Sequence, residues 1–497
     1  GEITAGVIES HGAIHLPLFK NKGLLSVGAR MTYLNLLFPD ILTLGTSRLK
    51  YDFYDLNFAY THFLNKGGRI KASFFTNKDN LKIIDRHNGS KDGRLGWGNI
   101  VSSISWVNNT LRCDIGFSRY ENSFKLIEAG RMLNLPSSMT QIDATAEYSL
   151  NDFNIAVQTI SRNTSGQRNS ANKDNIQDTA STAFEGSIAG DWNHYFTFGL
   201  DISAGIKCSL YSCKKWISPN LLPRIRIGYK LPESLRLYIS GGRYMKFDRM
   251  VETSTVGLPA DFYINSDQSL RPEEAWSGEF GIEGKIPLGM IDFSVELYAR
   301  RLLHCGEYVG SILDQLNPDY SPLSDIIDGK GYAYGLSVSL SRQFGSIRGR
   351  VGYNIGKSRL KFDRYGNEYF PASHDRLHDL SASLLWNPIS RLTLGATFTH
   401  ATGTPFTKAK YGYILGENLI CEYYPHNSSR LPAYNRLDLS AIWRMGSHSI
   451  NVSVYNALGS KNILFLYYSY SLSEGIKRKE SVMKTVIPSI SYTFIFK

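Results

Sequence analysis

The chain has 497 residues, a formal net charge of +11, 42% hydrophobic and 12% aromatic residues, and a mean hydropathy of −0.22. It contains no apolar run of the roughly 18 residues that a transmembrane helix needs, and no linker divides it into domains. The lysines and arginines are dispersed, so the positive charge does not predict a nucleic-acid partner.

Short turns and longer polar connections alternate along the chain. Ten segments carry the Gly, Pro, Asn or Asp residues that tight turns need: Phe19–Lys22, Leu64–Gly67, Val107–Asn109, Leu150–Asp152, Asp191–His194, Leu231–Ser234, Ile286–Gly289, Gln343–Ser346, Asn387–Ser390 and Gly446–His448. The longer connections include Asn77–Gly93, Asn163–Thr182, Asp248–Pro272, Val309–Gly331 and Thr407–Pro432. This alternation predicts an up-and-down antiparallel sheet with long loops at one end only.

The segments between the connections alternate apolar and polar residues with the period of a β-strand. Ile142 and Tyr148, for example, alternate with Asp143 and Glu147. A charge facing lipid costs about 2–4 kcal/mol near the bilayer midplane, so the charged set must face inward. We therefore predict an all-β transmembrane antiparallel barrel whose lumen-facing residues include Asp143, Glu147, Arg224, Arg226, Arg348 and Arg350.

The last strand, within 486–497, alternates without interruption. Tyr492, Phe494 and Phe496 share one face, and serine and threonine occupy the other. A terminal strand of this kind resembles the assembly signal of Gram-negative outer-membrane barrels, although Lys497 stands where that signal usually ends on an aromatic residue. The resemblance implies a barrel-assembly machinery as a partner.

The turns predict about 21 strands. If the last strand ends in the periplasm, an odd number places the beginning of the chain, Gly1–Thr4, on the outer side. Exported single-chain bacterial barrels have an even number of strands. The expectation is therefore a 22-stranded parent barrel whose first strand lies upstream of this chain, and 22-stranded barrels are transporters with a plugged lumen.

Several stretches, in this order, resemble the barrel of TonB-dependent outer-membrane receptors of the mid-sized type found in Bacteroidetes: Ser26–Leu34, Tyr54–Asn57, Gly257–Asp261, Leu270–Glu273, Gly331–Leu336, His374–Leu380, Arg430–Leu439 and Val454–Asn456. The resemblance implies a Gram-negative outer-membrane location, with lipid bilayer and lipopolysaccharide around the barrel. It also implies an amino-terminal plug with a TonB box, and the TonB–ExbB–ExbD complex as partner. Residues 1–497 would be the barrel domain alone, without that plug.

Two groups of residues are candidates for ligand contact. Exposed aromatic residues on outer loops often bind ligands, but they can equally form the upper aromatic girdle; this group contains Tyr244, Phe262, Tyr263, Tyr411, Tyr413, Tyr423 and Tyr424. The inward arginines named above could attract an anionic substrate, or they could pair with carboxylates of the plug.

No motif predicts catalysis, a cofactor or a metal site. The chain lacks HExxH, GxSxG, a Walker loop and CxxC, so we do not expect an enzyme. In the segment His374–Asp379, strand alternation separates the histidines from the aspartates, which favours a structural role. Cys208 and Cys213 could pair in an oxidising compartment or remain free thiols.

Three functions fit these patterns. The first is a TonB-dependent receptor that imports a scarce nutrient whose identity the sequence does not reveal. The second is a passive, porin-like channel without a plug. The third is a surface-binding barrel that only displays its loops.

Overall fold

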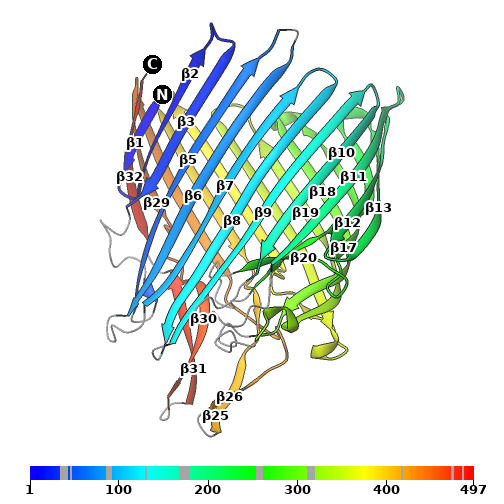
Figure 1. The fold of residues 1–497 in the computed structure, drawn as a ribbon. Helices are drawn as coiled ribbons and strands as arrows, with labels where there is room; N and C mark the ends of the chain where they lie inside the picture. The colour runs from blue at the N-terminus through cyan, green and yellow to red at the C-terminus, as the bar shows by residue number, and fades with distance from the viewer. Residues whose placement is uncertain are drawn as a thin grey trace.

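A computed structural model of the protein describes residues 1–33, 43–44, 47–65, 67–85, 92–128, 131–166, 180–252, 261–310, 320–415, 418–471, 475–483 and 486–496. Over these ranges one antiparallel sheet closes into a barrel (Figure 1). Its wall contains 22 strands: β1 (Glu2–Gly6), β2 (Glu9–Leu18), β3 (Gly23–Thr32), β5 (Ser47–Phe63), β6 (Arg69–Asp85), β7 (Asp92–Val107), β8 (Leu111–Glu128), β9 (Arg131–Leu150), β10 (Phe153–Ser165), β11 (Ala180–Tyr195), β12 (Leu200–Cys213), β13 (Trp216–Lys230), β14 (Arg236–Lys246), β17 (Glu273–Ile286), β18 (Ile291–Tyr308), β19 (Ile326–Arg342), β20 (Ile347–Phe362), β22 (His378–Ile389), β23 (Leu392–Ala401), β28 (Tyr434–Met445), β29 (His448–Tyr455) and β32 (Ile487–Ile495). Two strands of 2 residues, β4 (Thr43–Leu44) and β21 (Phe370–Pro371), pair with β5 and β20.

The barrel closes between its first and last strands. β1 pairs with β32, with Thr4 opposite Thr493 and their hydroxyl oxygens 2.7 Å apart. The amino group of Gly1 donates to the carbonyl oxygen of Phe496 at 2.6 Å. The 22-stranded architecture is therefore confirmed, with one strand more in this chain than the 21 expected. The expectation that the first strand of the barrel lies upstream, with Gly1–Thr4 on the outer side, is wrong, because β1 in this chain closes the barrel against β32. The sequence pattern hides β1 because its connection to β2, Val7–Ile8, is short and contains none of the residues typical of turns.

Most of the predicted short turns lie at the end that carries both termini (Figure 1). The long connections lie at the opposite end, together with the short connections Val7–Ile8 and Lys214–Lys215. The prediction of a turn at Asp191–His194 is wrong. These residues belong to β11, where strand pairing continues to Tyr195, and the turn is Phe196–Gly199. Gly199 has a φ of +94°, a conformation that glycine adopts without strain. The turn predicted at Asn387–Ser390 begins later, because β22 continues to Ile389 through an irregular register.

The long connections contain structure of their own. Much of the predicted loop Asn77–Gly93 is strand, since β6 continues to Asp85 and β7 begins at Asp92. Small hairpins stand in other connections: β15–β16 (Asp248–Val251, Phe262–Asn265), β24–β27 (Pro405–Phe406, Ser429–Arg430), β25–β26 (Ala409–Leu415, Asn418–Tyr423) and β30–β31 (Asn462–Ser471, Gly475–Met483). The described residues also contain four 3₁₀ turns: η1 (Pro232–Ser234), η2 (Pro287–Gly289), η4 (Pro322–Asp325) and η5 (Asp363–Tyr365).

The two faces of the wall have opposite character where the barrel crosses the bilayer. Outward residues are large, apolar and exposed, such as Ile104, Ile115 and Ile142 at 60%, 61% and 53%. Inward residues are polar and bond to one another, as the hydroxyls of Ser73 and Ser103 do at 2.7 Å. The outward apolar face is in contact with lipid, and the inward polar face lines the lumen.

Three further findings concern only the described residues. No helix there is long and apolar enough to cross a membrane. No group of three or more His, Cys, Asp or Glu side chains in those ranges could hold a metal ion. Cys208 and Cys213 are free thiols within β12, and their odd spacing places them on opposite faces of the strand.

Candidate ligand-binding site at the outer mouth

The long connections surround the outer mouth of the barrel (Figure 1). The β15–β16 hairpin, between β14 and β17, packs as a small core of its own: Val251, Phe262 and Ile264 are buried against Leu270, Tyr308 and Ile326. Phe262 is only 1% exposed. The structure therefore places this predicted ligand-contact residue in a core and not on the surface.

Polar contacts hold this hairpin against the wall formed by β8–β12. Asn265 donates through Nδ2 to the carbonyl oxygen of Ser181 at 2.9 Å. The hydroxyl of Tyr211 donates to the carbonyl oxygen of Ser266 at 2.8 Å. Tyr263, another predicted ligand contact, is half-buried and meets Tyr120 edge-on at 5.8 Å. These contacts connect the hairpin to wall strands that are far from it in sequence. They hold the hairpin in place at one side of the mouth.

A second set of contacts ties the connection after β20 to the connection after β23. Arg430 forms an ion pair with Asp375, which is 3% exposed and also accepts the backbone N–H of Ser358 at 2.6 Å. The structural role predicted for the segment His374–Asp379 fits these contacts, although Asp375 lies in a loop and not in a strand.

An aromatic stack joins the same two connections. His426 stacks on Tyr365 with ring centroids 4.1 Å apart, and its Nε2 lies 2.9 Å from Glu307. Burial, followed by the nearby charge of Glu307, raises the pKa of the Tyr365 hydroxyl. The stack therefore joins the connections after β20 and β23 to the end of β18. Two hairpins extend beyond these contacts.

Those hairpins, β25–β26 and β30–β31, project beyond the rim at the end opposite the termini (Figure 1), and β25 lies against β31. We call the exposed surface of β25–β26, together with the flanking residues Lys408 and Tyr424, the crest. It contains four tyrosines, 43–55% exposed, and two lysines: Lys408, Lys410, Tyr411, Tyr413, Tyr423 and Tyr424. Lys410 lies over the ring of Tyr411 at 5.4 Å, and Lys408 lies over Tyr424 at 5.6 Å. The crest also contains the exposed carboxylate of Glu422, which bonds to Tyr411. It is thus aromatic, with two lysines and one carboxylate.

The structure brings four of the seven predicted aromatic residues together on the crest. Tyr244 lies elsewhere, 53% exposed on the lumen face of β14, because it has the strand parity of Arg236, which bonds to lumen carboxylates. The prediction did not include the lysines, which the segment Lys408–Tyr413 shows interleaved with tyrosine.

Inside the barrel, part of the wall neutralises its own charge. Arg224 donates through Nε to Asp191 at 2.8 Å, reaching across β12 at Gly205, where a Cβ would collide with the Asp191 carboxylate. Arg226 lies 3.8 Å from Glu283 and 4.1 Å above the ring of Tyr238. The two expectations for these arginines, a substrate or plug carboxylates, did not include the partners that the wall itself supplies.

The other four predicted lumen residues lie on β9 and β20. Asp143 and Glu147 lie on the inner face of β9, in register with Gly116 and Arg112 of β8. Arg348 and Arg350 lie on the inner face of β20, and neither forms an ion pair with any residue that the structure describes. The wall near β20 therefore has positive charge available for another partner.

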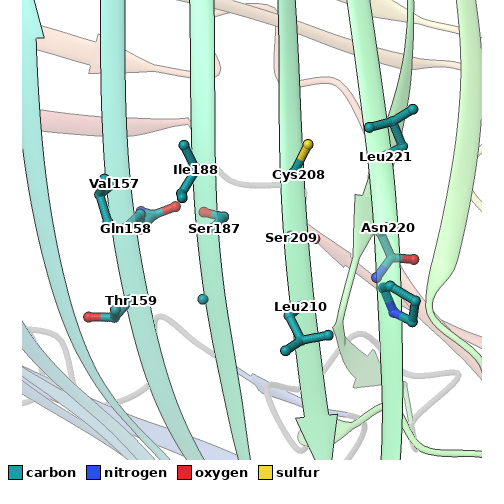
Figure 2. Close-up of a pocket in the computed structure, with 12 residues that line it drawn as sticks. Val157, Gln158, Thr159, Ser187, Ile188, Cys208, Ser209, Leu210, Asn220 and Leu221 are labelled. Carbon is teal, nitrogen blue, oxygen red and sulfur yellow. The ribbon is translucent and has the colours of Figure 1, made fainter.

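A groove of about 700 Å³ lies on the outside of the barrel, not at the mouth. Figure 2 shows Val157, Ile188, Cys208 and Leu221 across four neighbouring strands. Ile188 is 60% exposed on the apolar outward face. The groove therefore faces lipid, and we do not assign the nutrient ligand to it.

Comparison with known proteins identifies the family. The model of the TonB-dependent receptor-like β-barrel matches residues 30–457. The chain belongs to the TonB-dependent receptor family. No curated protein matches the chain in sequence.

Solved structures with the same fold agree. The ferric yersiniabactin uptake receptor FyuA of Yersinia pestis matches with a TM-score of 0.69 and 12% identity, over 100% of this chain and 80% of that one. The pyoverdine receptor FpvA of Pseudomonas aeruginosa gives 0.67 and 12%, over 100% and 78%. The ferric-catecholate import receptor Fiu of E. coli K12 gives 0.64 and 10%, over 100% and 81%. At these identities the likeness concerns the fold.

The family assignment settles the general function and location. This TonB-dependent receptor is an outer-membrane protein of a Gram-negative bacterium, and its family comprises nutrient receptors and importers rather than enzymes. The family is named after the TonB complex, on which its members depend for energy.

Proposed function

We propose that this receptor captures an anionic ferric chelate of the siderophore type at the crest and imports it through the barrel. The observation that carries the proposal is the grouping of four exposed tyrosines with Lys408 and Lys410 on the projecting hairpin β25–β26. Tyrosine rings provide rigid apolar area with a polar tip, and the lysines attract negative charge. A planar, anionic and partly aromatic ligand matches both features.

The structural neighbours support the ligand class. Fiu is a ferric-catecholate import receptor, FyuA is a ferric yersiniabactin uptake receptor, and FpvA binds pyoverdine. The alternative role of the crest tyrosines, an upper aromatic girdle, fits less well because β25–β26 projects beyond the barrel wall (Figure 1).

The charges of the lumen wall favour passage of the ligand through the barrel over its first capture there. Around β11–β17 the wall arginines already have carboxylate partners, so this side offers little net attraction for an anion. We propose that a plug domain with a TonB box occupies the lumen, that Arg348 and Arg350 meet its carboxylates, and that TonB–ExbB–ExbD drives its movement. We also propose that Tyr492, Phe494 and Phe496 are read by the barrel-assembly machinery.

Binding of ferric chelates to the purified receptor tests the proposal. Catecholate, hydroxamate and phenolate chelates would be titrated against the wild type and against a Tyr411→Ala, Tyr413→Ala, Lys410→Gln variant. Loss of two aromatic contacts and one charge, each worth about 1 kcal/mol or more in an interface, should weaken binding of the recognised chelate by roughly 100-fold. A matched control replaces Tyr195 and Lys230, which are exposed at the short-turn end.

Three outcomes contradict the proposal. If the crest variant binds every chelate as tightly as the wild type, the crest is not the capture site. If the wild type shows steady ion conductance in planar bilayers and no iron-dependent growth advantage in cells, it is a passive channel. Capture of a chelate by cells without uptake would instead indicate a binding barrel that only displays its loops.

A further inference from the structure

Ion pairs descend the lumen face of the wall between β11 and β18. The strands β11, β12, β13, β14, β17 and β18 are consecutive neighbours there. We call four of their ion pairs the ion-pair ladder: Lys207–Glu185 at 3.0 Å, Arg224–Asp191 at 2.8 Å, Arg300–Glu279 at 3.6 Å and Arg236–Asp201 at 3.0 Å.

The ladder extends over the whole apolar band of the barrel. Its upper pair lies below the β15–β16 hairpin, since Tyr211, which is opposite Glu185, donates to the carbonyl oxygen of Ser266. Its lowest carboxylate, Asp201, is opposite Tyr195 at the end that carries the termini. Ten residues of β11 separate Glu185 from Tyr195, which is roughly 34 Å along the strand at about 3.4 Å per residue. With a strand tilt of about 35–45° this becomes roughly 26 Å along the membrane normal, close to the apolar height of about 25 Å.

In all four pairs the cation is more open to the lumen than its carboxylate. The exposed fractions of cation and carboxylate are 24% and 7% for Lys207–Glu185, 47% and 22% for Arg224–Asp191, 48% and 28% for Arg300–Glu279, and 28% and 12% for Arg236–Asp201. An anion that moves along this wall therefore meets N–H donors first, and the carboxylate behind each donor weakens the attraction.

Glycines let two of the pairs lie flat against the wall. Gly205 is opposite both Asp191 and Arg224, and a Cβ there would collide with the Asp191 carboxylate. Gly228 is opposite Asp201, and a Cβ there would collide with that carboxylate. The bridging groups therefore lie close to the backbone of the intervening strand, and the pairs do not project toward the centre of the lumen.

We propose that the ion-pair ladder is the track along which the anionic ligand crosses the membrane, between this sector of the wall and the plug. Conduction requires contacts that are repeated and weak enough to release the ligand. Arg224 and the other ladder cations make these contacts, and Asp191 and its counterparts are positioning residues that keep each contact weak. The inference rests on the proposed function, since it needs an anionic ligand and a plug.

The lowest pair suits release on the periplasmic side. Arg236 has a second partner, Glu283, at 2.7 Å, and Glu283 is 36% exposed. Two carboxylates therefore offset this arginine, and one of them is more open to the lumen than the arginine itself. The attraction for an anion is weakest where the ligand has to leave the barrel.

Unpaired charge lies on either side of the ladder rather than within it. Asp143 and Glu147 on β9, and Arg348 and Arg350 on β20, form no ion pair with any residue that the structure describes. Charges enclosed between a plug and the wall need partners of opposite sign. The plug is therefore held most firmly beside β9 and β20, and the sector between them is the boundary that opens.

Uptake of a radiolabelled, anionic ferric catecholate by cells that make the full receptor tests the proposal. Asp191→Asn removes the carboxylate that weakens Arg224. The bared guanidinium should retain the anion and slow uptake at least about threefold, while the affinity of capture stays that of the wild type. The double variant Asp191→Asn, Arg224→Gln has no bare cation at this step and should recover most of the rate.

A matched control bares an arginine outside the ladder. Asp114→Asn removes the carboxylate that lies 2.6 Å from Arg112 on the lumen face of β8, and uptake should stay that of the wild type. Glu185→Gln bares Lys207 and repeats the test on another step of the ladder, so the proposal can be decided even if Asp191→Asn does not assemble.

Three outcomes overturn the ladder and leave capture at the crest intact. The first is uptake at the wild-type rate in both Asp191→Asn and Glu185→Gln. The second is equal slowing in Asp114→Asn. The third is a double variant as slow as Asp191→Asn alone, which would show that Asp191 acts only on the structure of the wall. A wild type that takes up no ferric catecholate contradicts an anionic catecholate as the nutrient, and the ladder with it.

Discussion

The strands β6–β9 have opposite polarity at their two ends. Where they cross the bilayer, Ile104 and Ile115 point outward to lipid and serines bond across the lumen face. Beyond the bilayer the same strands continue as an outer extension, and there Leu95 and Leu135 are buried on the inner face while cationic residues occupy the outer face. Strand pairing runs through both regions without a bulge. The medium around each region, and not the backbone, decides which face is apolar.

The inner core of the outer extension gives the largest expected effect. Leu135 is 0% exposed and packs with Leu95, Phe124 and Leu133. Leu135→Ala should cost about 2–5 kcal/mol, because burial is lost and a cavity remains. Since the bilayer holds the rest of the barrel, we expect the loss as faster hydrogen exchange in the outer halves of β8 and β9, with the membrane-crossing halves unchanged.

The matched control is Leu150→Ala on the same strand. Leu150 faces outward and is 51% exposed, so its replacement should leave exchange in the outer extension as in the wild type. Uniformly faster exchange along the whole of β9 in the Leu135→Ala variant would show that the two regions are one cooperative unit, which would contradict the comparison.

A charge on the outward face should be tolerated in one region and not in the other. Ile104→Arg places a charge against lipid and should destabilise the barrel by about 2–4 kcal/mol. Ser138→Arg places one on the same face in the outer extension, opposite Glu121, and should change stability by less than about 0.5 kcal/mol. Urea unfolding of barrels reconstituted in vesicles measures both, and equal losses would place Ser138 within the apolar layer.

This reversal explains what the sequence could and could not predict about the fold. In the crossing region, apolar residues alternate with the strand period, so the barrel, its facing pattern and most turns could be predicted. In the outer extension the residues Asn77, Lys78, Asp79 and Asn80 look like a loop, because polar residues occupy both faces of the strand there. The inward-facing leucines begin only after these residues. Only the pairing of β6 with β5 and β7 shows that the strand continues.

The candidate site divides in the same way. The crest tyrosines could be predicted because they are neighbours in sequence within one long connection. Phe262 could not be placed, since Tyr308 and Ile326, which help to bury it, come from other strands. The partner of Arg224 was equally hidden, because Asp191 lies two strands away and is reached only across Gly205.

The smallest expected effect concerns a titratable contact that only the outer region has. His374 Nε2 lies 2.8 Å from Glu252 and joins the connection after β14 to the connection after β20. The hydrogen bond to Glu252 raises the pKa of His374 above its usual 6.5, and the bond to His374 lowers the pKa of Glu252 below 4.5. The Arg224–Asp191 pair of the crossing wall contains no histidine.

The sign of the pH dependence follows from these two shifts. The contribution of His374 is fully present below its unfolded pKa and is lost as pH rises through the raised folded pKa, whereas that of Glu252 is lost only in acid. Because His374 is 78% exposed, the pair should contribute less than about 1 kcal/mol. Ring chemical shifts of His374 should titrate above pH 6.5 in the wild type and move down in Glu252→Gln, with hydrogen exchange in both connections rising above the wild-type midpoint. An unchanged midpoint in Glu252→Gln would show that the two connections are held by the neighbouring Asp375–Arg430 pair alone.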